Sequence, residues 1–454
     1  LEKIEFAWNI NELNWYINYE QLKNVGNWFQ KHFNSLIVDK IYCKLDYEAG
    51  YWLIRSLDED KIIKFKIDKD LYRCKFPFYK NLIPNSLNIN YNCKKFQNLH
   101  FICSKNEHLE KINSLTDIDL VGIIFWFLSR LEEADFNSNK DIYNRFSFQD
   151  SHIYRANIIQ KPVVDEWIYF LALNLFGKVN YESNYKINLT HDIDTLYRYK
   201  NKSLTRKVLS KLKDSLRIKN NFNKKFFYSK NRDEPYNTFE YLMSISDSRN
   251  IKSTFFFIPS NMRSLKDGDY RIDSPDIKKI LMLINERGHK IGVHPGYESI
   301  INHKNCIDDL CLFNKLLENL NINKVEDCRM HLLRWKHPNT IYLLKKMDIK
   351  RDWTLGFPQT MGFRSGTCNT YSLINPKTFE DSKILENNLN IMDFTLNSDV
   401  YMGAEKKEFL IRKIKNLGDI TRNFNGSINL LWHNHDVAWE KEKLFYEKIL
   451  LCLE

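Results

Sequence analysis

The second part of the chain alternates short apolar runs with longer amphipathic segments. The apolar runs are rich in β-branched and aromatic residues and predict strands at 186–190, 252–258, 289–294, 328–333, 350–353 and 427–432. Between them, apolar residues recur every three or four positions, which predicts helices at 238–247, 276–287, 307–320 and 338–347. Repeated strand and helix units of this kind predict a parallel sheet that closes, or nearly closes, into a (β/α) barrel.

The first part of the chain has a different pattern. Short aromatic alternations at 51–54 and 62–67 predict strands, and apolar segments at 118–131 and 163–176 predict helices. No cluster of potential catalytic groups accompanies them. A polar stretch around 180–184 separates the two patterns, so we expect a smaller α+β accessory domain at 1–180 and the barrel at 185–454.

Composition narrows the class of protein. Of the 454 residues, 43% are hydrophobic and 14% aromatic, which indicates a packed globular protein rather than a disordered or fibrous one. The nine cysteines form no CxxC pair and favour reduced thiols, hence a cytoplasmic location. No apolar run reaches the roughly 20 residues that span a bilayer. The chain begins at Leu1 rather than Met, so a preceding export signal would reverse the expected location.

Most of the net charge of +11 lies in one segment. Residues 201–232 contain eleven Lys or Arg and one acid, Asp214, which gives 11 − 1 = +10. The simplest interpretation is a solvated flap inserted into the barrel, and the functional one is contact with an acidic polymer or with lipid headgroups. Aromatic residues are interleaved with the charges, as on single-strand nucleic-acid surfaces. No recognised nucleic-acid module accompanies them, so we expect no specific nucleic-acid partner.

Side chains capable of catalysis follow the predicted strands of the barrel. In a parallel barrel the carboxyl ends of all strands meet on one face, which would bring these scattered positions into one site. The candidates are Asp192, Asp194, His294, Arg329, His331, Asp352 and His433.

Two of these carboxylates stand one residue apart, at Asp192 and Asp194, and strand alternation places them on the same side. Such a pair suits a division of labour, with one carboxylate binding a metal and the other acting as a base. The alternative is a helix N-cap beside a solvated acid. His294 precedes a Pro-Gly turn that would hold its ring at a loop mouth; a single histidine is more often a packing residue, but Asp194 gives this one a partner.

The remaining motifs each allow a functional and a structural interpretation. Arg329 could pin a carboxylate through a bidentate contact, while Arg334 and Trp335 are typical of surfaces and of sugar stacking. His433, at the end of the last apolar run, suits a general acid or simply caps the strand. The loop 362–368 is flanked by glycines but lacks the spacing of a phosphate loop, which argues against nucleotide binding.

Taken together, these motifs resemble the polysaccharide deacetylase family with NodB homology, in its divergent branch with an extra N-terminal domain. The matching stretches cover 185–436, and they are Thr190-His191-Asp192-Ile193-Asp194, 253–257, 288–295, Arg329-Met330-His331, Asp352, 362–368 and 431–433. The stretches 128–133 and 144–146 resemble the N-terminal domain that accompanies this branch.

The resemblance implies a distorted (β/α) barrel and a metal-dependent hydrolase that removes acetyl groups from N-acetylated sugars in surface-glycan metabolism. It implies a divalent metal, with Zn²⁺ expected. The roles it implies are Asp192 as general base, Asp194 and His294 as metal ligands, Arg329 as partner of Asp192, His433 as general acid and Asp352 as the residue that orients His433. The expected substrate contacts are Arg364, Trp335 and Tyr297.

Two features depart from the family pattern. Ile193 separates two aspartates that are usually adjacent, which leaves the division of roles between Asp192 and Asp194 open. The better-known members have a second histidine four residues after the first, where this chain has Glu298. The third ligand could be Glu298, His331 or His191, since carboxylate and imidazole both bind zinc. The departure at Glu298 also motivates an alternative function, a catalytically silent barrel that binds glycans.

Overall fold

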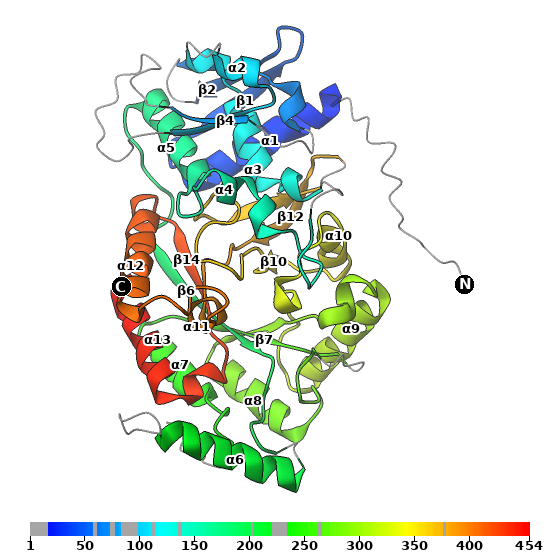
Figure 1. Ribbon diagram of the computed structural model, residues 1–454. Helices are drawn as coiled ribbons and strands as arrows, with labels where there is room; N and C mark the ends of the chain where they lie inside the picture. The colour runs from blue at the N-terminus through cyan, green and yellow to red at the C-terminus, as the bar shows by residue number, and fades with distance from the viewer. Residues whose placement is uncertain are drawn as a thin grey trace.

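A computed structural model describes the protein at residues 17–57, 61–72, 78–82, 99–110, 114–134, 139–200, 203–219, 234–260, 266–375 and 378–454. An N-terminal part packs on one end of a larger part built around a curled sheet (Figure 1).

The larger part is organised by a nine-stranded sheet in the order β11-β12-β10-β9-β8-β7-β6-β14-β13. Every neighbouring pair is parallel except β11 with β12. The sheet curls into a half-barrel and stays open between β11 and β13, which is consistent with the predicted distorted barrel. Its strands are β6 (Lys186–Ile193), β7 (Thr254–Phe257), β8 (Lys290–Val293), β9 (Asp327–Cys328), β10 (Arg351–Asp352), β11 (Tyr371–Ile374), β12 (Asp381–Glu386), β13 (Ile391–Met392) and β14 (Ser427–Leu431).

Helices cover the outside of this sheet (Figure 1). They are α7 (Phe239–Asp247), α8 (Pro275–Glu286), α9 (His303–Asn319), α10 (Asn339–Lys346), α12 (Lys407–Asn423) and α13 (Glu440–Leu453), with a short α11 (Asp393–Asn397) after β13. α8 begins where Ser274 accepts a hydrogen bond from the Ile277 backbone N–H and Pro275 occupies the first turn. α6 (Leu204–Lys219) occupies the part of the basic insertion that the structure describes.

The central strands are buried on both faces, which explains their continuous apolar sequence. All four residues of β7 are buried between the helices and the sheet interior. The six predicted strands each correspond to a strand of the sheet, but the one predicted at 328–333 ends at Cys328. Leu332 and Leu333 adopt positive φ values of 57° and 54°, so the chain turns away in a 3₁₀ helix, η8 (His331–Leu333).

The N-terminal part has an α+β composition. Its elements are α1 (Tyr19–Leu36), β1 (Ile41–Asp46), β2 (Tyr51–Ser56), β3 (Ile62–Lys66), β4 (Phe78–Leu82), β5 (Leu99–Cys103), α2 (Asn106–Glu110), α3 (Leu120–Leu128), α4 (His152–Arg155) and α5 (Val163–Phe176). Strands β1 to β3 form an antiparallel sheet, and β4 pairs with β5. Every residue of α3 is buried, because neighbouring elements cover it on all sides.

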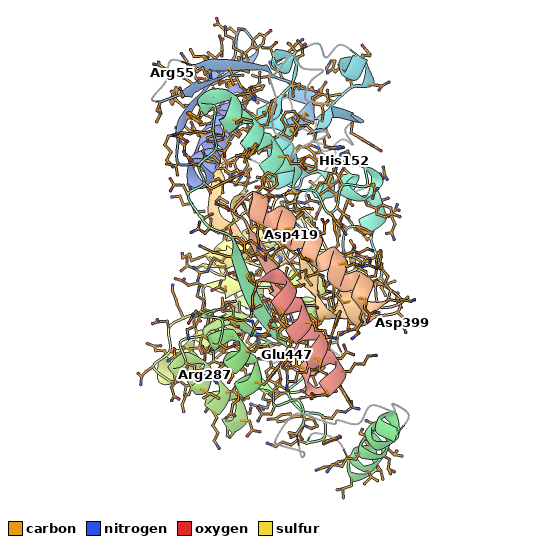
Figure 2. The ribbon with its side chains drawn as sticks, turned by 90° about the vertical axis from the view of Figure 1, so that its left-hand side faces the viewer. Arg55, His152, Arg287, Asp399, Asp419 and Glu447 are labelled. Carbon is orange, nitrogen blue, oxygen red and sulfur yellow. The ribbon has the colours of Figure 1, made fainter. Side chains whose placement is uncertain are left out.

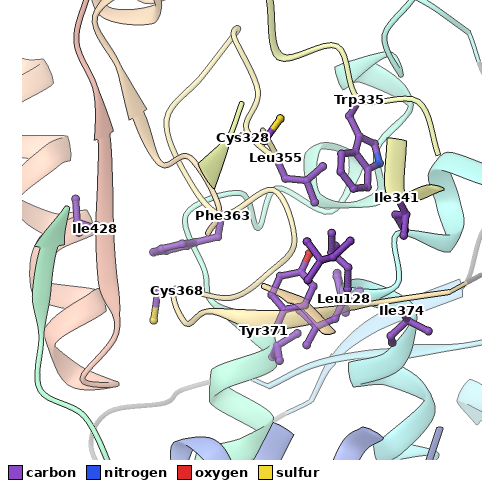
Figure 3. Close-up of a cluster of buried hydrophobic side chains, with 14 of the residues drawn as sticks. Leu128, Cys328, Trp335, Ile341, Leu355, Phe363, Cys368, Tyr371, Ile374 and Ile428 are labelled. Atoms are coloured by element: carbon purple, nitrogen blue, oxygen red, sulfur yellow. The ribbon is translucent and has the colours of Figure 1, made fainter. Parts of the chain in front are cut away.

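One hydrophobic core runs through both parts of the molecule. In Figure 3, Leu128 from α3 lies beside Tyr371 from β11. The polar contacts across this junction are also buried: the Asp165 carboxylate accepts hydrogen bonds from the Cys368 backbone N–H at 2.8 Å and from the Thr367 hydroxyl at 3.0 Å. The N-terminal part therefore forms one side of the larger part's core. Figure 2 gives a side view of the same stacking.

Candidate metal and catalytic site

The site lies where β6, β8, β9 and β14 end. Strand β6 presents alternate residues to opposite sides, which separates its polar side chains. Asp192 and Asp194 point toward the site, whereas the ring of His191 packs against Phe255 at 4.8 Å between centroids and its Nδ1 lies 2.9 Å from the Trp432 carbonyl oxygen. His191 is therefore turned away from the other candidates for the third ligand.

Three side chains bring metal-ligand atoms together. One atom each from Asp194, His294 and His331 lie within 4.8 Å of one another. The His294 Nε2 is 3.3 Å from Asp194 Oδ1, and the His331 Nε2 is 3.6 Å from Asp194 Oδ2. Asp194 Oδ1 is buried and has no hydrogen-bond partner, so this oxygen is available to a cation. A carboxylate and two imidazoles are a donor set suited to zinc.

Both ligand-type histidines are held through their other ring nitrogen. The Nδ1 of His294 donates to the Arg329 carbonyl oxygen at 2.5 Å, and the Nδ1 of His331 donates to Asp267 Oδ1 at 3.1 Å. These hydrogen bonds fix the tautomer that directs each Nε2 toward Asp194.

The loop that carries Asp267 approaches the site closely because of two glycines. A Cβ on Gly268 would lie 2.2 Å from the Asp194 carbonyl oxygen, and one on Gly296 would lie 2.8 Å from Asp267 Oδ2. The sequence analysis missed Asp267. Its one sequence signal is the neighbouring Gly268, a position where the backbone comes close to another segment.

The charges of the donor group shift its pKa values. Burial would raise the pKa of Asp194, but the charge of His331 and the neighbouring imidazoles of His294 and His433 outweigh burial and hold that pKa well below its usual range. Burial would lower the pKa of His331, but Asp194 and Asp267 raise it to about 9. The negative charges of Asp194 and Asp267 thus face the imidazole of His331.

Glu298 takes no part in this donor group. It is exposed, within a single 3₁₀ turn, η7 (Tyr297–Ile300), that follows the Pro-Gly turn after His294. Residues four apart share a face in an α-helix, but the turn that holds Glu298 is a 3₁₀ turn, in which positions three apart are aligned instead. His331, delivered by the chain after β9, stands in the donor group where Glu298 was one expected candidate.

Asp192 is paired with a buried arginine. The Arg329 guanidinium donates to Asp192 Oδ1 at 2.7 Å and to the Thr190 hydroxyl at 2.9 Å, and its Nε donates to the Trp353 carbonyl oxygen at 2.9 Å. Asp192 Oδ2 lies 3.5 Å from the His294 Nε2. One carboxylate oxygen is thus pinned, and the other faces the donor group.

His433 is held by Asp393 rather than by Asp352. Its Nδ1 lies 2.9 and 3.0 Å from the two Asp393 carboxylate oxygens, and its Nε2 is 3.4 Å from Asp194 Oδ2. Burial would lower the pKa of His433, but the charge of Asp393 and hydrogen bonds to Asp194 and Asp393 hold it well above its usual range. Asp393 follows the apolar pair 391–392, as Asp192 and Asp194 close an apolar strand, and this parallel is the sequence signal that could have identified it.

Asp352 lies deeper in the sheet, in contact with other groups. Its carboxylate accepts a hydrogen bond from the Thr354 hydroxyl at 2.7 Å and faces Glu386, which accepts from the Leu355 backbone N–H at 3.2 Å. Burial raises the pKa of both carboxyls, and the charge of Asp352 raises that of Glu386 further. Sequence reasoning placed Asp352 correctly at a strand end but could not indicate which neighbour it contacts.

The three expected substrate contacts lie in different surroundings. Arg364 is buried, and its guanidinium donates to the Glu133 carboxylate at 3.0 and 2.7 Å. Arg364 therefore belongs to the junction between the two parts of the molecule. Trp335 is 2% exposed and belongs to the core shown in Figure 3. Tyr297 is half-buried, and its backbone N–H donates to Asp267 Oδ1 at 2.7 Å, next to the donor group.

Comparison with known proteins gives limited overlap. A model of a family of unknown function, DUF7033, matches residues 42–180, and no curated protein matches the chain. A protein from Mycobacterium smegmatis described as a polysaccharide deacetylase is similar at 13% identity and a TM-score of 0.39, over 60% of this chain and 84% of that one.

Two further solved structures show a similar level of likeness. The chitin deacetylase of Colletotrichum lindemuthianum is 11% identical with a TM-score of 0.30, over 60% of this chain and 82% of that one. A polysaccharide deacetylase of Bacillus cereus is 11% identical with a TM-score of 0.27, over 59% and 86%.

Proposed function

We propose that this protein is a metal-dependent hydrolase that removes acetyl groups from N-acetylated sugars in surface-glycan metabolism. The observation that carries the proposal is the arrangement around Asp194: a three-residue donor group next to both the Asp192–Arg329 pair and the Asp393–His433 pair. A metal site flanked by a carboxylate base and a protonated imidazole is one arrangement that supports amide hydrolysis at neutral pH.

Asp194, His294 and His331 would hold a divalent ion, with zinc as the expected metal. The unpartnered Asp194 Oδ1 supports this fit, since a buried carboxylate oxygen without a donor is costly unless a cation approaches it. When bound, the ion supplies Lewis acidity, which polarises a carbonyl group and makes water more acidic.

Asp192 would take the proton from the attacking water. The Arg329 guanidinium donates to one Asp192 oxygen at 2.7 Å, and its other terminal nitrogen donates to the Thr190 hydroxyl. The second contact fixes the guanidinium, which in turn restricts rotation of the Asp192 carboxylate. The free oxygen, Oδ2, faces the donor group. Arg329 is a positioning residue in this scheme, because it acts through Asp192.

His433 would give a proton to the departing amine. Asp393 accepts from its Nδ1 and raises its pKa, so the ring is protonated at neutral pH. The Nε2 of His433 lies 3.4 Å from Asp194 Oδ2, and Asp192 Oδ2 lies 3.5 Å from the His294 Nε2. Base and acid next to different atoms of the donor group would allow one proton to be taken and another delivered without moving either side chain far.

The alternative function, a silent glycan-binding barrel, was motivated by Glu298. With His331 among the donor atoms, the donor group does not depend on Glu298, and no other observation favours the silent barrel. Of the expected substrate contacts we retain Tyr297, which lies beside the donor group.

The first test is metal content of the purified chain by mass spectrometry. We expect about one divalent ion per chain in the wild type. We expect loss of that ion in Asp194→Ala and His331→Ala, and unchanged content in Glu298→Gln. Equal metal content in all four proteins, or none in the wild type after reconstitution, would contradict the assigned ligands.

The second test is release of acetate from N-acetylated oligosaccharides. We expect Asp192→Asn and His433→Gln to lose at least about a hundredfold in rate while they keep the metal. A wild type that is fully loaded with metal but releases no acetate from any such sugar would contradict the reaction and leave the metal site standing.

A further inference from the structure

The helix α6 exposes an apolar face that the rest of the described chain does not cover. Leu204, Val208, Leu209 and Leu212 are 82%, 56%, 63% and 54% exposed. Steps of four, one and three residues along a helix place these four side chains on one side. Figures 1 and 2 show α6 at the end of the molecule, set apart from the barrel. Four exposed aliphatic side chains on one short helix differ from the scattered singles of an ordinary surface.

Basic residues flank this apolar face. The helix contains six Lys or Arg and one acid, Asp214, for a net charge of 6 − 1 = +5. Arg206 and Lys211 are exposed and Lys207 is half-buried, and the Lys211 Nζ lies 5.3 Å from the Tyr199 ring centroid. Helical spacing places these three charges to either side of the four apolar residues rather than among them. A helix with this division lies flat in the interface of a bilayer, its apolar side in the acyl boundary and its cations on the headgroups.

We propose that α6 docks the protein onto an anionic lipid surface. No helix among the described residues is long and apolar enough to cross a membrane, so the contact would be peripheral. This inference does not depend on the chemistry proposed for the site.

Charge complementarity selects this occupant over others. A second copy of α6 would bring two helices of charge +5 together, which like-charge repulsion opposes. Single-stranded nucleic acid binds by stacking bases on aromatic rings, and α6 contains no aromatic residue. Anionic headgroups neutralise the flanks while the acyl region takes the apolar face.

The position of α6 in the chain gives docking a consequence for the site. Leu204 follows Asp194 by 204 − 194 = 10 residues, and α6 extends from the strand end that carries the site. A docked α6 would therefore bring that end of the barrel to within a short tether of the lipid surface.

The test is co-sedimentation of the full chain with vesicles of phosphatidylcholine alone or mixed with phosphatidylglycerol. We expect binding to the mixed vesicles only, weakened by salt. Leu209→Glu combined with Leu212→Glu should lower the partition coefficient at least about tenfold. Arg206→Gln combined with Lys207→Gln should lower it by about 30-fold, from about 1 kcal/mol for each charge.

The matched control is Leu312→Glu combined with Leu451→Glu, two leucines of α9 and α13 that are 53% and 63% exposed. This variant should bind as the wild type does, and thermal unfolding should show all variants folded. Equal binding by the α6 variants, or no binding by the wild type, would overturn the proposal. So would a lipid-free dimer or an oligonucleotide complex that the α6 variants abolish.

Discussion

Three histidines of the site are held in the same way, by a hydrogen bond from Nδ1 to an oxygen of the protein. The acceptors are the Arg329 carbonyl for His294, Asp267 for His331 and Asp393 for His433. Each bond leaves Nε2 as the atom that faces the site and restricts rotation of the ring. The site is therefore built as much by the acceptors as by the histidines.

Asp267→Asn tests this at one ligand. The amide oxygen can still accept from His331 Nδ1, but the negative charge that raises the basicity of the ring is gone, so we expect metal affinity to fall about 10- to 100-fold. Competition with a chromophoric chelator measures this affinity. Asp273→Asn, at an exposed aspartate of the same loop region, is the control and should leave it unchanged. Equal affinities in both variants would show that Asp267 does not support the ligand.

Asp393→Asn tests the proton on His433. Asp393 raises the pKa of His433, so removing its charge should lower that pKa. The protonated ring donates the proton in the proposed reaction, and activity should therefore decline at a lower pH in the variant than in the wild type. The alkaline limb of the pH profile for acetate release and an NMR titration of His433 both report the shift. An unmoved alkaline limb would mean that another group sets it.

Residue by residue, sequence reasoning found the groups that lie next to apolar strands. Asp192, Asp194, His294, Arg329 and His433 all carry this signal, and all five meet around the donor group. It did not identify Asp267 or Asp393 as acceptors. These hydrogen-bond partners depend on where a distant loop lies in the folded protein, and a single sequence does not give that position.

At the scale of elements, a buried ionic cluster joins η5 (Leu131–Ala134) to the loop after β10. Glu133 accepts from Arg364 at 2.7 Å and from Arg130 at 2.7 Å, and these three side chains are at most 3% exposed. Burial would raise the pKa of Glu133, but the two guanidinium groups hold it at about 2. The cluster is balanced only while the carboxylate is present.

Glu133→Gln should therefore destabilise the protein by about 3–5 kcal/mol, because the buried Arg364 guanidinium loses its counter-charge, whereas Arg130 keeps Glu132 at 2.6 Å. Urea unfolding at neutral pH measures the change. As a control, Asp419→Asn removes the surface pairs of Asp419 with Lys415 and Arg422, in which the Asp419 side chain is 47% exposed, and it should cost at most about 1 kcal/mol. A loss below about 1 kcal/mol for Glu133→Gln would show that the arginines find other partners.

Elements with a clear periodic pattern were predictable, and short irregular ones were not. The helices at α7 to α10 follow from apolar spacing and the strands at β6 to β8 from continuous apolar runs. Strands β11, β12 and β13 were not predicted from the sequence. The last of these has two residues, Ile391–Met392, and its pairing with β14 is set by the sheet rather than by local pattern.

At the scale of the whole molecule, buried neutral histidines make stability depend on pH. Burial lowers the pKa of His32, His191 and His337 to about 4 and that of His100 to about 3, from 6.5 in an unfolded chain. Below pH 6.5 these histidines bind protons in the unfolded chain but stay neutral in the folded chain. The stability contributed by these groups is complete above pH 6.5 and declines as the pH falls toward about 4.

We expect each such histidine to remove about 2 kcal/mol of unfolding free energy between pH 7 and pH 5. The Asp119 and Glu166 carboxyls, whose pKa values burial raises to about 7, act in the opposite sense over the same range and offset part of the loss. Urea unfolding at both pH values measures the balance. His32→Leu should reduce the loss by about 2 kcal/mol, and an unchanged pH dependence in that variant would contradict the assignment.

The junction between the two parts limits how this protein can change. The Asp165 carboxylate accepts a hydrogen bond from the backbone of the 367–369 loop. Among the ion pairs of the described residues, Glu133 is the only acidic partner of Arg364. A barrel expressed from residue 185 onward would lack both partners. The Arg364 guanidinium and the Cys368 backbone N–H would then be exposed to water or would promote aggregation. Exchange of the N-terminal part between relatives would likewise require exchange of the 362–371 segment, so the two stretches have to be inherited together.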